Sequence, residues 1–184
     1  MPYALTIVNE PSPPEPVSVD ELKTHLHITQ SAHDVMLAGL ITAARIKYER
    51  ANGRQLITAT WKLELDGFPE DGVVYMPRPP LQWTANTHVK YWDTSGVQQT
   101  LVKDTDYVGD ITSEPGRIKP AYGKVWPTTR SIMNAVEIQF DAGYGAAADV
   151  PEAIKLDIKG QAARWFMEPE SVEMPGLYKV VSFG

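Results

Sequence analysis

The spacing of apolar residues changes twice along this 184-residue chain, and this change constrains its fold most strongly. Apolar side chains between residues 34 and 52 recur at helical spacing, and those from residue 151 onward do so again. Between these segments, in "ATWKLELD" and "VEIQF", the period is two, which is typical of half-buried strands. No connection between the candidate strands is long enough for a parallel crossover. The pattern therefore predicts an α+β fold, in which a helical domain of two N-terminal helices and one C-terminal helix carries an antiparallel β-rich insertion.

Capping signals predict where the helices begin and end. Ser18 and Glu21 form a capping box, with Val17 and Leu22 as a hydrophobic staple, so the first helix is expected to run to about His27. The second helix is expected to begin near Ser31 and to end before Gly53. For the third helix, which is expected to reach about Met167, the predicted N-terminal residues are Asp149 as the cap, Pro151 in the first turn and Glu152 in a capping pair.

Short strands are expected between the helices, separated by turn signals such as Asp71-Gly72 and Ser95-Gly96. In "MPRPP" (76–80) the prolines Pro77, Pro79 and Pro80 cannot donate to a strand ladder, so a rigid corner poor in hydrogen bonds is expected there. The expected strands are 57–66, 72–76, 87–92, 97–102, 106–109, 116–119 and 136–140.

These elements divide the chain into four parts. The expected division is an extended N-terminal arm (1–16), a helical domain (17–56 and 148–168), the β-rich insertion (57–147) and a C-terminal tail (169–184). The tail is apolar.

Composition narrows the function classes. A net charge of −6 does not favour wrapping duplex DNA, and the absence of cysteine excludes disulfides and thiolate chemistry. No apolar stretch approaches the ~20 residues of a membrane-spanning helix, and the N-terminus lacks the basic region of a signal peptide. We expect a protein that folds in the cytoplasm and has no membrane partner.

The second and third helices each carry two apolar faces. One face of each suits an intrachain core, and the other suits a neighbouring copy, unless both faces are buried within one subunit. The residues expected on the face between subunits are Val35, Ile46, Leu156 and Met167.

Motifs for catalysis are weak, and no catalytic, cofactor-binding or metal-binding residue is expected. His25, His27 and His33 lack the spacing of a metal site. "GYGAAA" (143–148) imitates a dinucleotide fingerprint but lacks the following parallel strand with its acidic residue, so a strand-to-helix hinge is the better interpretation. The acid pairs Asp104/Asp106 and Glu168/Glu170 lie in turn-like or terminal contexts. A small enzyme that uses the histidines or acids remains an alternative.

Bases and aromatic residues interleave without an acid in "GRIKPAYGKVWPTTR" (116–130). Such a surface can bind nucleic acid, which makes a nucleic-acid-binding factor the alternative function. The other interpretation is a long solvated hairpin loop whose aromatic residues cover the β-rich insertion, and the net negative charge of the chain favours it. The candidate residues are Arg117, Lys119, Lys124, Trp126 and Arg130.

Five segments, in this order and spacing, carry a resemblance to a known family: "VSVDELKTHLHI", "DVMLAGLITAARIKYERANGRQL", "MPRPPLQ", "DYVGD…EPGRIKP…GKVWP" and "FDAGYG…DVPEAIK". Over about 17–167 the chain resembles the head–tail connector, or adaptor, proteins of long-tailed double-stranded DNA bacteriophages and related prophages. The resemblance implies a virion structural protein at the head–tail interface, made in the cytoplasm of a bacterial host. Within the same resemblance, the nucleic-acid-binding alternative is a packaging or head-completion factor that uses the segment 116–130. It also implies a ring, expected to be a dodecamer, beneath the portal protein, which extends the DNA channel and receives the next head-completion or tail component.

Within this resemblance, the apolar tail is expected to dock onto the portal. The expected contact residues are Trp165, Leu177, Tyr178, Val181 and Phe183. DNA is expected to pass through the acidic lumen without specific binding, because a basic lumen would hold phosphates.

Overall fold

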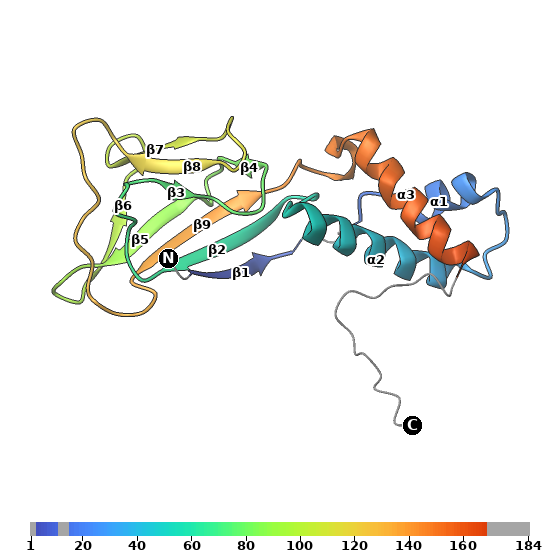
Figure 1. Ribbon diagram of the computed structural model, residues 1–184, viewed down its shortest axis with the longest axis horizontal. Helices are drawn as coiled ribbons and strands as arrows, with labels where there is room; N and C mark the ends of the chain where they lie inside the picture. The colour runs from blue at the N-terminus through green and yellow to red at the C-terminus, as the bar shows by residue number, and fades with distance from the viewer. Residues whose placement is uncertain (1–2, 11–14, 169–184) are drawn as a thin grey trace, which may run out of the picture. The chain divides into compact units, whose positions relative to one another are not determined.

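The computed structural model describes residues 3–10 and 15–168, and the fold is α+β, as the apolar periods predict. The chain forms two compact units (Figure 1). Of the described residues, the β unit comprises 3–10 and 52–150, and the helical unit comprises 15–51 and 151–168.

Two antiparallel sheets build the β unit. The larger sheet has the strand order β1-β2-β9-β5-β6, with the short β4 also paired to β9, and the smaller sheet has the order β3-β8-β7. The strands are β1 (Tyr3–Asn9), β2 (Ala59–Leu65), β3 (Val74–Tyr75), β4 (Leu81–Gln82), β5 (His88–Trp92), β6 (Gln98–Leu101), β7 (Tyr107–Asp110), β8 (Arg117–Pro120) and β9 (Val136–Ala142).

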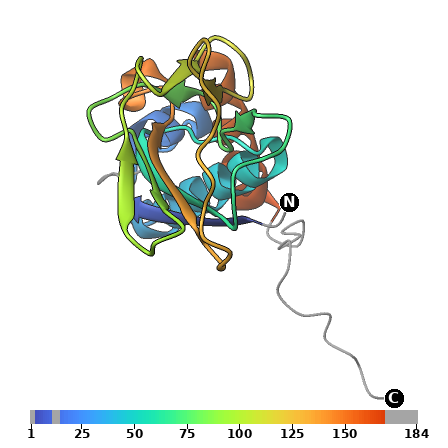
Figure 2. The same ribbon diagram turned by 90° about the vertical axis from the view of Figure 1, so that its left-hand side faces the viewer.

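The core of the β unit lies between these two sheets (Figure 1 and Figure 2). The alternating residues of β9, Val136, Ile138 and Phe140, are fully buried, as the period of two predicts. They share one apolar cluster with Tyr107 and Ile118 of the smaller sheet. The register of β9 is therefore fixed, because a slip by one residue would turn this apolar set to solvent.

The proline corner at 76–80 carries the chain from one sheet to the other. β3 ends at Tyr75 in the smaller sheet, and β4 begins at Leu81 in the larger one. The expectation of a corner poor in hydrogen bonds is only partly right. The carbonyl of Pro79 accepts from Gln55 N–H at 3.2 Å, and that of Pro80 accepts from Gly143 N–H at 2.9 Å. Proline lacks a donor but keeps its acceptor, so the corner ends a ladder while it anchors two other segments.

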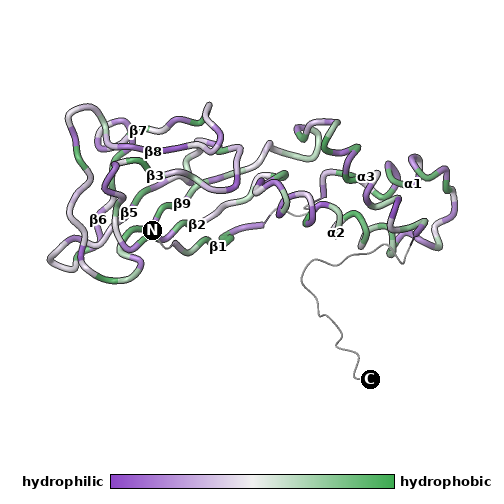
Figure 3. The backbone as a smooth tube through the Cα atoms, viewed as in Figure 1, coloured by the Kyte–Doolittle hydropathy of each residue, from purple (hydrophilic) through white to green (hydrophobic). Residues whose placement is uncertain are grey.

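The helical unit contains α1 (Val19–Leu26), α2 (Asp34–Asn52) and α3 (Glu152–Met167). The capping box is present: Ser18 N–H donates to the Glu21 carboxylate at 2.6 Å, and Glu21 N–H donates to Ser18 Oγ at 3.1 Å. This backbone hydrogen bond from Ser18 is the main reason that the pKa of Glu21 lies below its usual range. Along α2 and α3, short hydrophobic and hydrophilic stretches alternate, as the hydropathy colours in Figure 3 show.

Three local predictions need correction. Asp149 does not cap α3: it lies in a short 3₁₀ turn, Ala147–Asp149, where its carboxylate accepts from Ala146 N–H at 2.8 Å. The second helix begins at Asp34, because residues 31–33 form a turn before it. Residues 3–9, expected only as an extended arm, form the edge strand β1 paired with β2. The β-branched and aromatic residues of "YALTIVN" were the available signal for this strand.

Candidate functional site

The helical unit exposes three of the four apolar residues expected at a subunit interface. Val35, Leu156 and Met167 are 90%, 56% and 68% exposed, and Ile46 is partly buried. Leu37 and Ile41 of α2 are buried, as are Ile154 and Ile158 of α3. Within the helical unit, each of these two helices therefore has one buried apolar stripe and apolar side chains that the unit itself leaves in solvent.

Trp165, expected at a portal contact, lies instead in the interior of the helical unit. It is only 5% exposed, and Lys47 Nζ lies 5.3 Å from the centre of its ring. Lys47 is itself held by a hydrogen bond of 2.9 Å to Gln161 Oε1 on α3. Trp165 therefore packs α3 against α2 and offers little surface to a partner. The other expected contact residues, Leu177, Tyr178, Val181 and Phe183, lie outside the described residues.

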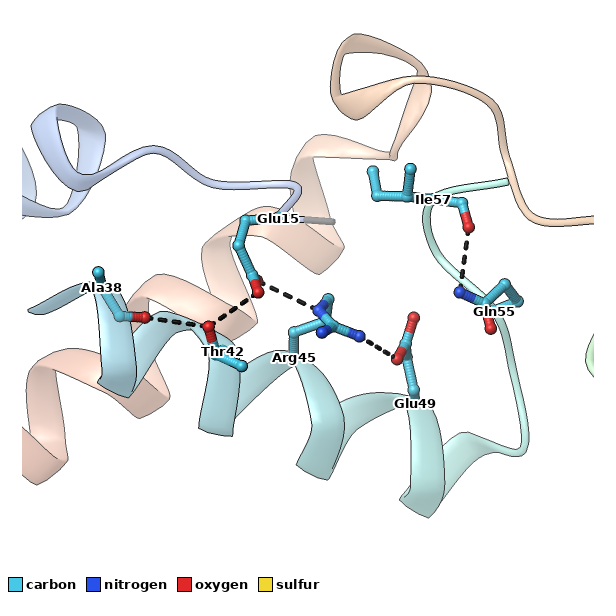
Figure 4. A network of polar contacts seen from close by, with 7 residues as sticks. All are labelled: Glu15, Ala38, Thr42, Arg45, Glu49, Gln55 and Ile57. Carbon is cyan, nitrogen blue, oxygen red and sulfur yellow. Dashed lines mark hydrogen bonds and ion pairs between the residues drawn. The ribbon is translucent and has the colours of Figure 1, made fainter. Parts of the chain in front are cut away.

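A charged network fixes the start of the helical unit against α2 (Figure 4). Arg45 donates to Glu15 at 3.2 Å and to Glu49 at 2.7 Å, and Thr42 Oγ1 donates to Glu15 at 2.8 Å. Burial disfavours the charge on Arg45, but the two carboxylates outweigh it, so the pKa of Arg45 is raised. The same figure shows the buried Gln55, whose side chain donates to the Ile57 carbonyl at 3.0 Å in the β unit.

The basic segment 116–130 is partly neutralised and partly built into the β unit. Arg117 pairs with Asp110 at 3.1 Å, and Lys124 approaches Asp106 at 4.0 Å. Lys119 and Arg130 are exposed.

Trp126 belongs to the packing of the β unit. Its ring stacks on Phe68 with centroids 4.4 Å apart, and its indole N–H donates to the Gly72 carbonyl at 3.0 Å. A ring held in this way is not free to stack on a base. The interpretation as a loop whose aromatic residues cover the insertion describes Trp126 well.

The glycine segment 143–148 uses its backbone donors within the chain. Gly143 N–H donates to Pro80, Tyr144 N–H donates to Leu56 at 2.8 Å, and Ala146 N–H donates to Asp149. A phosphate-binding loop needs such donors to point at its ligand. Gly143 itself has a φ of +131°, and a Cβ there would lie 2.6 Å from the Thr58 backbone. Glycine is therefore required at this position by strand packing.

The histidine and acidic side chains of the described residues were candidates for a metal site. No group of three or more His, Asp or Glu side chains within 3–10 and 15–168 is placed to hold a metal ion. His27 adopts the left-handed conformation that ends α1, and His33 packs edge-on against Phe166. Asp106 accepts from Val102 N–H at 2.9 Å within a turn.

None of the helices in the described part of the chain combines the length and apolarity of a membrane span.

One buried polar cluster, around Asp141, has no local signal in the sequence. Asp141 on β9 is buried and accepts from Thr60 Oγ1 at 2.6 Å, from Thr84 Oγ1 at 2.6 Å and from Asn86 Nδ2 at 3.0 Å. These bonds tie β2 and the turn before β5 to β9. All three side chains donate to the Asp141 carboxylate, so we interpret the cluster as a set of bonds that holds these segments together.

Comparisons with known proteins identify the fold. No protein-family model matches the chain, and a search of curated proteins finds no match. Among solved structures, the fold is similar to that of a chain in the neck of an empty GTA particle computed with C6 symmetry, with a TM-score of 0.72, 23% identity and coverage of 98% of this chain and 90% of that chain.

Two further solved structures are similar. A chain in the virion of a native gene transfer agent (GTA) particle has a TM-score of 0.73 and 20% identity, covering 95% of this chain and 87% of that one. A chain in the neck of a native GTA particle computed with C12 symmetry has a TM-score of 0.69 and 23% identity, covering 89% of this chain and 83% of that one. These likenesses establish that the chain shares its fold with subunits of such particles.

Proposed function

We propose that this chain is a structural subunit of the neck of a phage-like particle, where identical copies form a ring at the junction of head and tail. The observation that carries the proposal is the fold match to a chain in a GTA neck across 98% of this chain and 90% of that one. Because nearly the whole of both chains matches, the likeness is not confined to a common supersecondary motif. The segments that resemble connector proteins lie in both units.

The exposed apolar residues of the helical unit support a ring. A soluble monomer gains nothing by leaving Val35 and Met167 in water. In a ring, each subunit presents two different surfaces, and such heterologous contacts close when the rotation per copy closes. We assign the face that contains Val35, Ile46, Leu156 and Met167 to the contact between copies. The expected copy number is twelve.

The ring is proposed to lie beneath the portal protein and to extend the DNA channel toward the next head-completion or tail component. No reaction is required of it. The net charge of −6 suits a channel along which DNA slides without phosphate binding. A ring whose lumen is lined mainly by lysine and arginine would contradict this part of the proposal.

The test is co-assembly with the portal protein of the same phage-like particle. We expect a complex in which native mass spectrometry counts a fixed number of copies of this chain per portal ring, and in which negative-stain images show a second ring coaxial with the portal. A complex of one or two copies, or no complex, would refute the proposal.

Two variants separate the surfaces. Deletion of residues 169–184 should abolish portal binding and leave the far-ultraviolet circular dichroism of the chain unchanged, whereas Val35→Lys should weaken contacts between copies. Unchanged portal binding by the deleted chain would remove the tail from the interface.

The nucleic-acid alternative predicts a salt-dependent gel shift that is lost in Lys124→Ala/Arg130→Ala. The ion pair of Lys124 and the stacked ring of Trp126 do not favour this outcome.

A further inference from the structure

The larger sheet of the β unit has two open edges. Along the path β1-β2-β9-β5-β6, both β1 and β6 have a ladder partner on one side only, among the residues that the structure describes. An open edge presents a row of backbone N–H and C=O groups that can pair with a strand of another chain. Proteins that must remain monomeric usually protect such edges with charged side chains, prolines or very short strands.

In the larger sheet, charged residues lie on the inner strands and are absent from the two edge strands. The inner strands carry charged residues on one face: Lys62 and Glu64 on β2, Glu137 on β9 and Lys90 on β5. Neither β1 nor the stretch 97–102, "VQQTLV", contains a charged residue or a proline. The two edge strands of this path therefore lack the charged side chains and prolines that would oppose pairing.

Both edges also expose apolar side chains. Tyr3 and Val8 of β1 are 61% and 52% exposed, and Val97 and Val102 at the ends of β6 are 55% and 57% exposed. Tyr3 in addition lines an open pocket of about 330 Å³ whose other walls are apolar, including Leu65, Tyr75 and Pro77. β1 has seven residues and β6 (Gln98–Leu101) has four, which is enough for a short ladder between them.

The direction of the strands decides how two copies can meet. Four antiparallel pairings separate β1 from β6, namely β1–β2, β2–β9, β9–β5 and β5–β6, so β1 and β6 run in the same direction. A rotation that continues the strand order therefore places β6 of one copy beside β1 of the next as a parallel pair. This contact joins two different surfaces, and such a contact propagates around a ring.

We propose that β6 of one subunit pairs with β1 of the next, so that the larger sheets of neighbouring copies are continuous through the ring. The occupant of each edge is a second copy of this chain. This inference rests on the proposed ring function and adds a named contact to it: backbone hydrogen bonds supply the affinity, and the apolar side chains at positions 3, 8, 97 and 102 bury surface against the neighbour.

Thiol cross-linking tests the contact directly, because the natural chain has no cysteine. Thr6 and Thr100 are both exposed, and the register places them on the same face of the sheet, with Lys62 and Lys90. Thr6→Cys and Thr100→Cys are prepared separately, in the full chain. Each is treated with a short bifunctional thiol reagent, alone and as an equal mixture, at protein concentrations up to the millimolar range.

The mixture is expected to give at least tenfold more cross-linked dimer than either variant alone. A mixture of Thr6→Cys with Ala85→Cys is the control, since Ala85 is an exposed turn residue outside both edges. Cross-linking of Thr6→Cys with itself would show a two-fold β1–β1 contact and overturn the proposal. A yield for the 6/100 mixture no higher than that of the control would also overturn it.

Assembly of charged variants separates this inference from the proposed function. Thr6→Lys/Val8→Lys should lose the ring on the portal, whereas Ala85→Lys should retain it. Rings that form equally with the charged β1 edge would overturn the strand contact and leave the neck function intact. A chain that forms 6/100 cross-links but never assembles on the portal would retain the strand contact and contradict the neck function.

Discussion

Replacement of Asp141 by alanine should destabilise the β unit strongly. Asp141 is 5% exposed, and its two carboxylate oxygens accept three side-chain hydrogen bonds, from Thr60, Thr84 and Asn86. Truncation removes the shared acceptor and leaves the buried Thr60 hydroxyl without this partner. It also releases the turn that precedes β5 from β9.

The magnitude follows from the number of bonds. A hydrogen bond to a charged group contributes about 1.5–3 kcal/mol, and three bonds to one acceptor are not additive, so we expect a loss of about 3 kcal/mol. For a chain of this size, that loss lowers the melting temperature by roughly 6–12 °C. Thr84→Val removes a single donor and should lower the free energy of unfolding by only about 1 kcal/mol.

Urea unfolding followed by circular dichroism measures both changes, with the slope m as a check that the unfolded state is unaltered. Asp71→Ala is the matched control, because Asp71 is exposed and accepts only one N–H, from Val73 at 3.2 Å. If the free energy of unfolding of Asp141→Ala lies within about 1 kcal/mol of that of the unmodified chain, with the same m, the carboxylate does not hold these strands together and the reasoning is wrong.

Two further predictions concern the β unit and the first helix. Gly143→Ala should lower the free energy of unfolding by more than about 2 kcal/mol, since a Cβ would meet the Thr58 backbone at 2.6 Å. Gly160→Ala, within a helix and with open space around it, should raise the free energy of unfolding by up to about 1 kcal/mol. Urea midpoints that do not separate these two variants would contradict the packing argument. Glu21 has a pKa below its ordinary value of 4.5, so it contributes stability above that pH and loses the contribution as the pH falls through the lowered pKa. The stability difference between the unmodified chain and Glu21→Gln should therefore shrink from pH 7 to pH 3, and a difference that is constant with pH would show that the charge has no part in the cap.

Local signals in the sequence predicted much of this fold. The capping box at Ser18 and the alternation in β2 and β9 are patterns of neighbouring residues, and the structure contains each of them. The short strands between 72 and 120, except β4 at Leu81–Gln82, were predicted because glycine and proline turns bound them.

The missed features depend on contacts between distant segments. The strand β1 forms only because β2, more than fifty residues later, supplies its partner. Asp141 became a buried acceptor through donors 55–81 residues away, which no local pattern records. The position of Asp149 before Pro151 predicts an N-cap for α3, but its carboxylate accepts from Ala146 N–H and closes the 3₁₀ turn in which Asp149 lies.

The structure gives the burial of the candidate contact residues, and the contacts themselves stay predictions. Helical spacing separated the apolar faces of α2 and α3 and identified Val35, Leu156 and Met167, which are exposed. The same spacing could not tell which of two apolar stripes would be covered, and Trp165, which we expected at a portal contact, is buried. Burial of this kind depends on the packing of α3 against the other helices, which spacing along one helix does not contain.

Cryo-electron microscopy of phage-like particles that carry this chain with a small fused tag tests the central claim most directly. We predict that the tag density forms a closed ring of identical copies between head and tail, that the ring surrounds the DNA channel, and that each copy fits the α+β fold described above. Tag density in the capsid shell or the tail tube, or particles that contain none of the tagged chain, would contradict the account.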